Sequence, residues 1–340
     1  MEKQPFIRYL ANQRHFHIDR LKTIAGIADI PPLFVGIMKI NTFCNFEEKD
    51  IQMVLTSSGT KGQKTQSFFD AASLNRLSSL ALKCFHACGW TSDVPAHFFV
   101  MGYNIEEAKN LGTSWSNNQL LSLAPNKSVN WTILKDDKGE FNFDYAYWAR
   151  KVIELSEDAP IRLTGFPAFM SQLAYEIQRI KPGFKVKEGS FITSGGGWKN
   201  HKGNVLTHQE FGALMEESMG ISTACIRDIF GMAEHGIPYC SCSAGHYHIP
   251  VYSRLLIRDP LSLEVLPDET EGLMNLISPY NMAQPNLSVL ATDLAIIKEN
   301  CPCGIQGKYI SSIRRGGISK NRGCAIAAQE ILNKSQGGKS

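Results

Sequence analysis

Segments with the character of strands and of helices alternate through residues 51–224 of this chain. Apolar, aromatic and β-branched residues predict the strands, which cover residues 51–55, 97–103, 131–134, 161–164 and 190–193. Start and stop residues such as Asp70, Pro167 and Thr207 predict the helices, which cover residues 70–88, 145–155, 167–180 and 207–220. From about residue 225 short strands follow, separated by Pro, Gly and Asn. This order predicts βαβ units with a parallel sheet and then a smaller β-rich part.

Composition describes an ordinary globular protein. The 340 residues are 43% hydrophobic and 20% charged, and no apolar run approaches the ~18 residues of a membrane-spanning helix. A net charge of +3 leaves no basic footprint for nucleic acid. The N-terminus lacks the apolar stretch of a secretory signal, and nine cysteines then indicate a reducing compartment. We expect a cytoplasmic protein with no membrane span and no nucleic-acid partner.

A loop rich in hydroxyls, glycines and lysines follows the first predicted strand. It reads Thr-Ser-Ser-Gly-Thr-Lys-Gly-Gln-Lys-Thr at residues 56–65. Backbone N–H, hydroxyl and ammonium groups of such a loop can bind a phosphate chain, because glycine permits close backbone approach. The spacing is not that of a Walker A loop. From these residues alone, a phosphate loop and an ordinary polar turn both remain open.

Three more segments contain candidate binding residues. Two of them follow predicted strands, and the third lies within an apolar run. Gly195, Gly196 and Gly197 could let a flat base lie on the backbone, or form a flexible turn. Glu234, in Gly-Met-Ala-Glu-His, could bind Mg²⁺ or face a nucleotide, or lie solvated in a turn. Asp293 lies in the apolar run Ala-Thr-Asp-Leu-Ala and needs a hydrogen-bond donor if buried. That donor is either a ligand hydroxyl or a backbone N–H.

Cysteines and histidines are concentrated in two short segments. Cys240-Ser241-Cys242 precedes His246 and His248, and Cys301-Pro302-Cys303 follows later in the chain. Thiolates and imidazoles from two segments can complete a tetrahedral zinc site, and a closed site of this kind is structural. The Cys-x-Cys spacing is tighter than the usual Cys-x-x-Cys, and small core residues are the alternative. We choose as ligands Cys242, His248, Cys301 and Cys303, with Cys240 and His246 in reserve.

In chain order these motifs resemble the layout of adenylate-forming enzymes. The phenylacetate–CoA ligase type shares Thr-Ser-Ser-Gly-Thr, the Cys/His elements and Cys-Pro-Cys-Gly. The acyl-protein synthetase (LuxE) family is closer, since residues 195–199, 231–235 and 322–327 look like that family. The resemblance covers about residues 50–332. It implies the α/β fold of the N-terminal part of adenylate-forming enzymes, with a β-rich subdomain.

The resemblance also implies a reaction and roles for the candidate residues. A carboxylic acid would be activated by ATP, with Mg²⁺, to an acyl-adenylate, and pyrophosphate would leave. Gly195 to Gly197 would pack against adenine, Glu234 would face Mg²⁺ or the phosphates, and Asp293 would bind the ribose hydroxyls. Arg314 or Arg315 would be the hinge arginine. The phosphates would be bound by Thr56, Ser57, Ser58, Gly59, Thr60, Lys61, Gly62 and Lys64.

The residues after the hinge position separate two enzyme hypotheses. Only 25 residues follow Arg315, so we expect the C-terminal lid domain of the CoA ligases to be largely missing. Cys324 follows Lys320 and Arg322 in this tail. Nearby cations lower the pKa of a thiol and favour the thiolate nucleophile. In acyl-protein synthetases a C-terminal cysteine takes the acyl group and passes it to a partner protein. The alternative is that Cys324 is a small buried residue on a helix over 323–332.

We therefore expect four parts in the chain. They are an N-terminal helical segment (1–50), an α/β nucleotide-binding core (51–224), a β-rich subdomain with the zinc site and Asp293 (225–315), and a tail with Cys324 (316–340). The expected function is activation of a fatty acid and transfer of the acyl group to a protein cysteine, with a reductase or carrier as acceptor. The alternatives are an aryl- or acyl-CoA ligase and a zinc-stabilised, non-catalytic binding protein.

Overall fold

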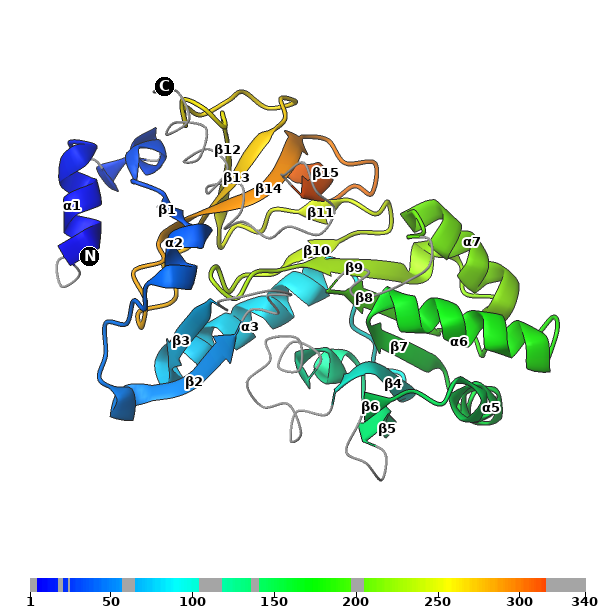
Figure 1. Cartoon of the computed structure of the whole chain (residues 1–340). Helices are drawn as coiled ribbons and strands as arrows, with labels where there is room; N and C mark the ends of the chain where they lie inside the picture. The colour runs from blue at the N-terminus through cyan, green and yellow to red at the C-terminus, as the bar shows by residue number, and fades with distance from the viewer. Residues whose placement is uncertain are drawn as a thin grey trace, which may run out of the picture.

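The computed structural model describes residues 5–17, 21–23, 25–56, 65–103, 118–135, 141–196 and 205–315. Thirteen strands form one long sheet (Figure 1). They are β1 (Leu33–Phe34), β4 (Ala96–Tyr103), β5 (Asn126–Lys135), β6 (Phe141–Asn142), β7 (Ile161–Gly165), β8 (Phe191–Gly195), β9 (Ile226–Phe230), β10 (Tyr239–Ser241), β11 (Tyr247–His248), β12 (Arg254–Arg258), β13 (Gly272–Ile277), β14 (Ser288–Lys298) and β15 (Tyr309–Arg315). In space their order is β12-β13-β14-β15-β11-β10-β9-β8-β7-β4-β5-β6, and β1 pairs with β14.

Five neighbouring strands, β5-β4-β7-β8-β9, are parallel, as the alternating pattern predicts. The helices that connect them are α5 (Tyr145–Leu155), α6 (Pro167–Ile180) and α7 (His208–Met219). α5 packs on α6 and α6 on α7, and together they cover one face of the sheet with a core that includes Leu163, Ile192 and Met215. The predicted bounds of α5 and α6 are confirmed residue for residue. Thr207 caps α7 with a capping box, and Gly220 ends it in the left-handed conformation.

Helix α3 (Ala71–Ala87) covers the opposite face. Asp70 is its N-cap, as predicted, and accepts a hydrogen bond from Ser73 N. Residues of α3 share a core with Phe191 of β8, whereas the next residue, Ile192, belongs to the core under α6 and α7. Successive strand residues point to opposite faces, so the two cores lie on the two sides of the parallel sheet.

The remainder of the sheet is antiparallel from β9 through β10, β11, β15, β14 and β13 to β12. The N-terminal segment joins this part, because β1 pairs with β14 and α2 (Val35–Ile40) packs on the same strand. The expected boundary at 224/225 falls immediately before β9, inside a continuous sheet. The segment before the sheet also includes α1 (Pro5–Gln13), and short 3₁₀ turns are η2 (Ala25–Asp29), η3 (Glu48–Asp50), η4 (Leu121–Leu123) and η5 (Thr223–Cys225).

A separate two-stranded sheet carries the candidate phosphate loop. It consists of β2 (Ile51–Thr56) and β3 (Gln66–Asp70), paired antiparallel from Ile51 opposite Asp70 to Thr56 opposite Gln66. Leu55 and Phe69 point toward Leu77 and Leu80 of α3. A lone hairpin is marginally stable in water, so its position depends on this packing and on the contacts of its free edge.

One predicted strand was too short. The prediction at 131–134 corresponds to β5, which begins at Asn126. The first residues of β5, including Lys127 and Ser128, have poor strand propensity. They are nevertheless in the strand because β5 pairs with β4 from Asn126, opposite Ala96, onward. Tertiary pairing outweighs local propensity here.

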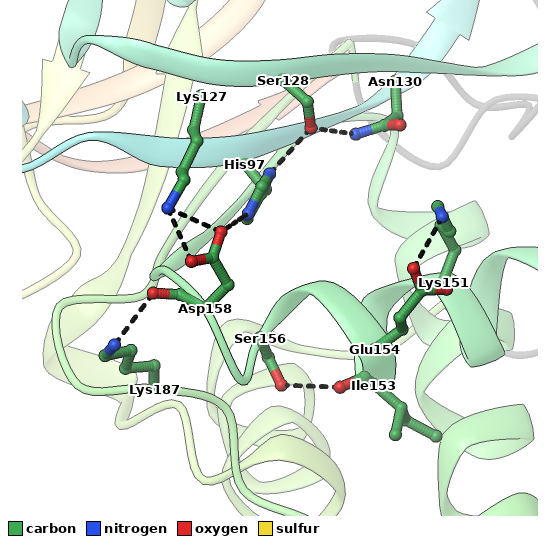
Figure 2. Close-up of polar contacts among 10 residues, drawn as sticks. All are labelled: His97, Lys127, Ser128, Asn130, Lys151, Ile153, Glu154, Ser156, Asp158 and Lys187. Atoms are coloured by element: carbon green, nitrogen blue, oxygen red, sulfur yellow. Dashed lines mark hydrogen bonds and ion pairs between the residues drawn. The ribbon is translucent and has the colours of Figure 1, made fainter.

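The amino end of the parallel strands is closed by a polar cluster (Figure 2). His97 of β4 contacts Ser128 Oγ through Nδ1 at 2.8 Å and Asp158 Oδ2 through Nε2 at 3.1 Å. Lys127 Nζ donates to the Asp158 carboxylate at 2.6 Å, and Lys187 Nζ donates to the Asp158 backbone oxygen at 2.9 Å. The cluster therefore ties the start of β4 and β5 to the loop between α5 and β7.

No helix in the described ranges has the length and hydropathy needed to cross a bilayer.

Candidate nucleotide site and cysteine–histidine cluster

The candidate nucleotide site lies at the carboxyl ends of β8 and β9. In doubly wound sheets a ligand often lies where the strand order reverses, which here is between β4 and β7. That position is closed by backbone, since Phe166 N donates to Met101 O and a Cβ on Gly165 would lie 2.4 Å from the same oxygen. Glycines and acidic residues that could bind a nucleotide lie instead further along the sheet, at the ends of β8 and β9.

Gly195 and Gly196 end β8 with little room for side chains. A Cβ on Gly195 would lie 2.5 Å from Ile229 Cγ2, and Gly196 has a φ of +75°. Both positions therefore require glycine, the first for packing against β9 and the second for its backbone conformation. The backbone here is bare, as packing against a flat base requires. Gly197 lies outside the described residues.

Glu234 follows β9 in a tight turn in which His235 N and Gly236 N both donate to Met232 O. The residue is 4% exposed. Its backbone oxygen accepts a hydrogen bond from Asn286 Nδ2 at 2.6 Å, while its carboxylate has no hydrogen bond or ion pair with any residue of the described ranges. Its oxygens are not among the fully buried atoms that lack a partner, so the carboxylate reaches the surface of the described ranges and is available to a cation or another ligand.

The structure adds Asp228, which the sequence reasoning missed. Its carboxylate accepts hydrogen bonds from Ser194 Oγ at 2.8 Å and from the Tyr247 hydroxyl, and its backbone N–H donates to Ser241 Oγ at 2.7 Å. Burial raises the pKa of the Asp228 carboxyl, and the hydrogen bonds from Tyr247 and Ser194 oppose that rise. The signal was present, because Asp228 is an acidic residue in the apolar strand Ile-Arg-Asp-Ile-Phe, the pattern that drew attention to Asp293.

Asp293 lies on β14, on the face that points to the Glu234 turn. Ala291 and Ala295, two residues away on either side, share a core with the half-buried Met232 of that turn. Asp293 lies opposite Arg315 on β15. Burial raises the pKa of the Asp293 carboxyl, while the charges of Arg315 and Lys39 oppose the rise. A ligand hydroxyl between these elements would meet a carboxylate acceptor.

The two candidate hinge arginines differ in their surroundings. Arg314 lies opposite Leu294 and forms a bidentate pair with Glu271, with Nε 2.6 Å from Oε1. Arg315, which lies opposite Asp293, points to the same face of the sheet as that carboxylate. The structure thus places Arg315 rather than Arg314 beside the candidate ribose-binding residue.

The four chosen cysteine and histidine side chains are brought together. The ligand atoms of Cys242, His248, Cys301 and Cys303 all lie within 4.8 Å of one another. Cys242 Sγ and Cys301 Sγ are 3.7 Å apart, and Cys303 Sγ is 3.2 Å from His248 Nε2. Two sulfurs on one tetrahedral zinc ion would be about 3.8 Å apart, given Zn–S bonds of about 2.3 Å. The spacing therefore fits a zinc ion.

The two reserve ligands lie beside the cluster in different ways. His246 Nδ1 is 3.3 Å from Cys301 Sγ, and its ring stacks on Tyr309. Cys240 lies instead with Cys84 and Cys88 in the core under α3. A strand alternates its side chains, so Tyr247, between His246 and His248, points away from the cluster and toward Asp228.

Several predicted residues cannot be placed. Thr56 is described, at the end of β2 opposite Gln66. The others lie outside the described residues: Ser57, Ser58, Gly59, Thr60, Lys61, Gly62, Lys64, Gly197 and Cys324.

Comparison with known proteins gives a family match over nearly the whole chain. The family model described as "Acyl-protein synthetase, LuxE" matches residues 6–333. A curated protein of Vibrio harveyi, named long-chain-fatty-acid–luciferin-component ligase, is 26% identical over 343 residues, which cover 96% of this chain and 88% of that protein.

Solved structures give the same architecture. An open conformation of 2-hydroxyisobutyryl-CoA ligase, in complex with 2-HIB-AMP and CoA, has a TM-score of 0.70 at 15% identity and covers 98% of this chain and 76% of that one. ATP-bound MatB from Rhodopseudomonas palustris has a TM-score of 0.52 at 16% identity, with 82% and 51% covered. At these identities the likeness shows the fold, which is that of adenylate-forming ligases, as expected.

Proposed function

Because this chain belongs to the acyl-protein synthetase (LuxE) family, we propose that it activates a long-chain fatty acid and transfers the acyl group to a protein cysteine. Family membership makes it an ATP-dependent carboxylate ligase that forms an acyl-adenylate. The name of the Vibrio harveyi relative, which joins a long-chain fatty acid to a luciferin component, supports a fatty acid as substrate and a protein as acceptor.

The first half-reaction is adenylation. A carboxylate oxygen of the acid attacks the α-phosphorus of ATP, an O–P bond forms, and the bridge between the α- and β-phosphorus breaks to release pyrophosphate. Glu234 is the observation that carries this proposal, because its carboxylate has no partner in the described ranges and follows the last of the parallel strands. An oxygen ligand of this kind suits Mg²⁺. When bound, the ion neutralises charge on the phosphates.

The remaining residues bind and orient the nucleotide. We assign the phosphates to Thr56 and residues 57–64, with Lys61 supplying positive charge to the phosphoryl oxygens, and adenine to the backbone of residues 195–197. Asp293 would accept hydrogen bonds from the ribose hydroxyls. Of the two arginines, Arg315 is the better candidate for the hinge because Arg314 is engaged by Glu271.

The second half-reaction is acyl transfer. The Cys324 thiolate would attack the carbonyl carbon of the acyl-adenylate, form a C–S bond and expel AMP, and the thiol proton would pass to solvent. A second thiol, on the acceptor protein, would then take the acyl group by thioester exchange. Cys324 lies outside the described residues, so this assignment is supported by the family alone.

We propose zinc as the ion held by Cys242, His248, Cys301 and Cys303. The ligands come from the β10–β11 hairpin and from the segment between β14 and β15, so the ion would tie two parts of the antiparallel sheet. Four protein ligands leave no open position, which makes the role structural.

ATP–pyrophosphate exchange against a panel of carboxylic acids tests the first half-reaction. We expect exchange that requires both a long-chain acid and Mg²⁺; its absence from folded protein with every acid would refute the proposal. Labelled fatty acid and ATP test the second. We expect a hydroxylamine-labile label on the wild-type protein and none on Cys324→Ser, which should retain exchange. A variant that is still labelled, or a wild-type protein for which free CoA is the efficient acceptor, would refute acyl transfer through Cys324.

A further inference from the structure

The connector between β13 and β14, residues 278–287, lies among elements from four parts of the chain. We call this segment the amide connector, because it places three buried side-chain amides at its contacts. Asn281, Gln284 and Asn286 are 8%, 3% and 3% exposed. Buried amides must find hydrogen-bond partners, and each of these three donates to a backbone oxygen outside the connector.

Two of the amides bind the free edge of β3. Asn281 Nδ2 donates to Phe68 O at 3.0 Å, and Gln284 Nε2 donates to Gln66 O at 2.9 Å. These oxygens are two residues apart on one strand, so they point to the same edge, away from β2. The two side chains thus take the place that a third strand would occupy. Gln66 is also the residue opposite Thr56, at the base of the candidate phosphate loop.

The third amide binds the turn that carries Glu234. Asn286 Nδ2 donates to Glu234 O at 2.6 Å, only two residues along the connector from Gln284. One short segment therefore contacts both the base of the phosphate loop and the peptide of Glu234. The hairpin β2–β3 and strand β9, which precedes the Glu234 turn, belong to different sheets and do not pair with each other.

Further contacts fix the connector itself. Met282 N donates to Ser73 Oγ at 2.9 Å, and Arg76 of α3 donates to Tyr280 O at 2.8 Å. Gln284 Nε2 also donates to Phe43 O at 3.1 Å. The Ser278 N–H closes the connector on Leu287 O at 2.9 Å. Because the connector is itself held by these hydrogen bonds, the backbone groups that bind its amides are held in a fixed position as well.

We infer that Gln284, with Asn281 and Asn286, is a positioning residue for the adenylation site, setting the phosphate-loop hairpin at a fixed place relative to Glu234. This inference rests on the proposed adenylation, since it concerns the affinity of that site for ATP. None of the three amides is assigned a contact with the nucleotide. Their effect comes through the backbone oxygens of Gln66, Phe68 and Glu234.

The test replaces the donor without changing the shape of the side chain. Gln284→Met removes both hydrogen bonds, and loss of two bonds to a buried amide should weaken ATP·Mg²⁺ binding about tenfold. The dissociation constant is measured by titration calorimetry, and the KM values for ATP and for the acid are measured in pyrophosphate exchange. The KM for ATP should rise with the dissociation constant, while the KM for the acid stays within about twofold.

Asn130→Leu is the matched control. Asn130 Nδ2 also donates twice, to Phe98 O and Ser128 Oγ, both at 3.0 Å, but it lies in the cluster at the amino end of the sheet. This variant should lower the melting temperature and leave ATP binding unchanged. If Gln284→Met does not fold, Asn281→Asp replaces it. This change keeps the acceptor for Ala283 N and puts a carboxylate oxygen in place of the donor to Phe68 O, with an expected weakening of about threefold or more.

The outcomes separate this inference from the proposed function. A wild-type protein that binds ATP but exchanges no pyrophosphate refutes adenylation alone, and the ATP dissociation constants still test the connector. Unchanged ATP binding in a folded Gln284→Met, an equal rise in both KM values, or the same loss in Asn130→Leu overturns the inference. A wild-type protein that binds no ATP overturns both.

Discussion

The two ends of the same parallel strands carry polar groups of opposite character. At the amino end, His97, Ser128 and Asp158 contact one another and two lysines, and no side chain of the cluster lacks a partner (Figure 2). At the carboxyl end, the Glu234 carboxylate has no partner within the described ranges, and Gly195 and Gly196 leave the backbone bare. Polar groups that bind one another stabilise a fold, whereas a carboxylate without a protein partner remains free to bind a ligand.

The cluster at the amino end contains the residue types of a catalytic triad. Ser128, His97 and Asp158 lie in the order of a nucleophile, a base and an orienting acid. However, the Asp158 carboxylate is shared between His97 and Lys127, and Ser128 Oγ also accepts from Asn130 at 3.0 Å. Groups so fully engaged with one another hold strands together, and we assign this cluster a structural role.

The largest expected effect is at Glu234. Glu234→Gln should reduce pyrophosphate exchange by about 10²-fold or more, because a charge that faces the phosphates is lost. The same change should leave the melting temperature close to that of wild type, since the carboxylate has no hydrogen bond or ion pair to lose within the described ranges. Exchange rates and thermal melts measure the two effects. Lower stability with unaltered exchange would place Glu234 in the same class as the amino-end cluster.

The next effect concerns the metal cluster. Cys301→Ser should eliminate bound zinc and lower the free energy of unfolding by about 4 kcal/mol, because a structural metal contributes its binding energy to folding. Metal analysis and urea unfolding are the measurements. Cys44→Ser, at a cysteine outside the cluster whose thiol donates to Phe46 O, is the control and should change neither value. Freshly purified, unchelated protein without zinc would remove this site.

A smaller effect is expected at the amino end. His97→Ala removes one hydrogen bond from each of Ser128 and Asp158, and should lower the free energy of unfolding by about 2 kcal/mol. Pyrophosphate exchange at a temperature where the variant is folded should stay within about twofold of wild type. A specific loss of exchange in folded His97→Ala would break the distinction between the two ends.

The smallest effect is a difference in pH dependence. Hydrogen bonds from Lys127 and His97 lower the pKa of Asp158 below its ordinary value of 3.8, so its contribution to stability is present above pH 3.8 and is lost as the pH falls further. Burial raises the pKa of Asp228 above 3.8, so the folded state binds the proton more tightly and loses stability as the pH rises through that raised value.

Unfolding free energies measured from pH 3 to pH 7 test these signs. The deficit of Asp158→Asn relative to wild type should shrink toward acid pH. The stability of Asp228→Asn relative to wild type should improve as the pH rises. Two curves with the same slope would show that the two carboxyl groups do not differ in the way their surroundings indicate.

Local patterns predicted most elements of the fold, and tertiary pairing decided the rest. The bounds of α5 and α6 and the caps of α3 and α7 depend on residues next to each helix end, so they were read correctly. The first half of β5 depends on β4, which no local pattern reveals. The continuation of the parallel sheet into antiparallel strands at β10 likewise requires the positions of distant segments.

The candidate site shows the same division. Single motifs predicted Gly195, Glu234 and Asp293 as candidate site residues, and predicted the four cysteine and histidine residues that the structure brings together. The partners of these groups were not predictable, because Tyr247 reaches Asp228 across 19 residues and Asn286 reaches Glu234 across 52. Asn and Gln in an irregular connector read as ordinary loop residues until the structure shows which backbone oxygens they bind.

The position of β5 has a consequence for solubility. Within the described ranges, only Leu134 and Lys135 of this strand pair with β6, so residues 126–133 present an open edge. Open edges invite pairing with another chain, and natural proteins place lysine there to prevent it. Lys127 provides that charge, and the exposed Val129 beside it is the position most at risk. The ion pair that secures the amino end of the sheet thus also fixes a charge that opposes aggregation.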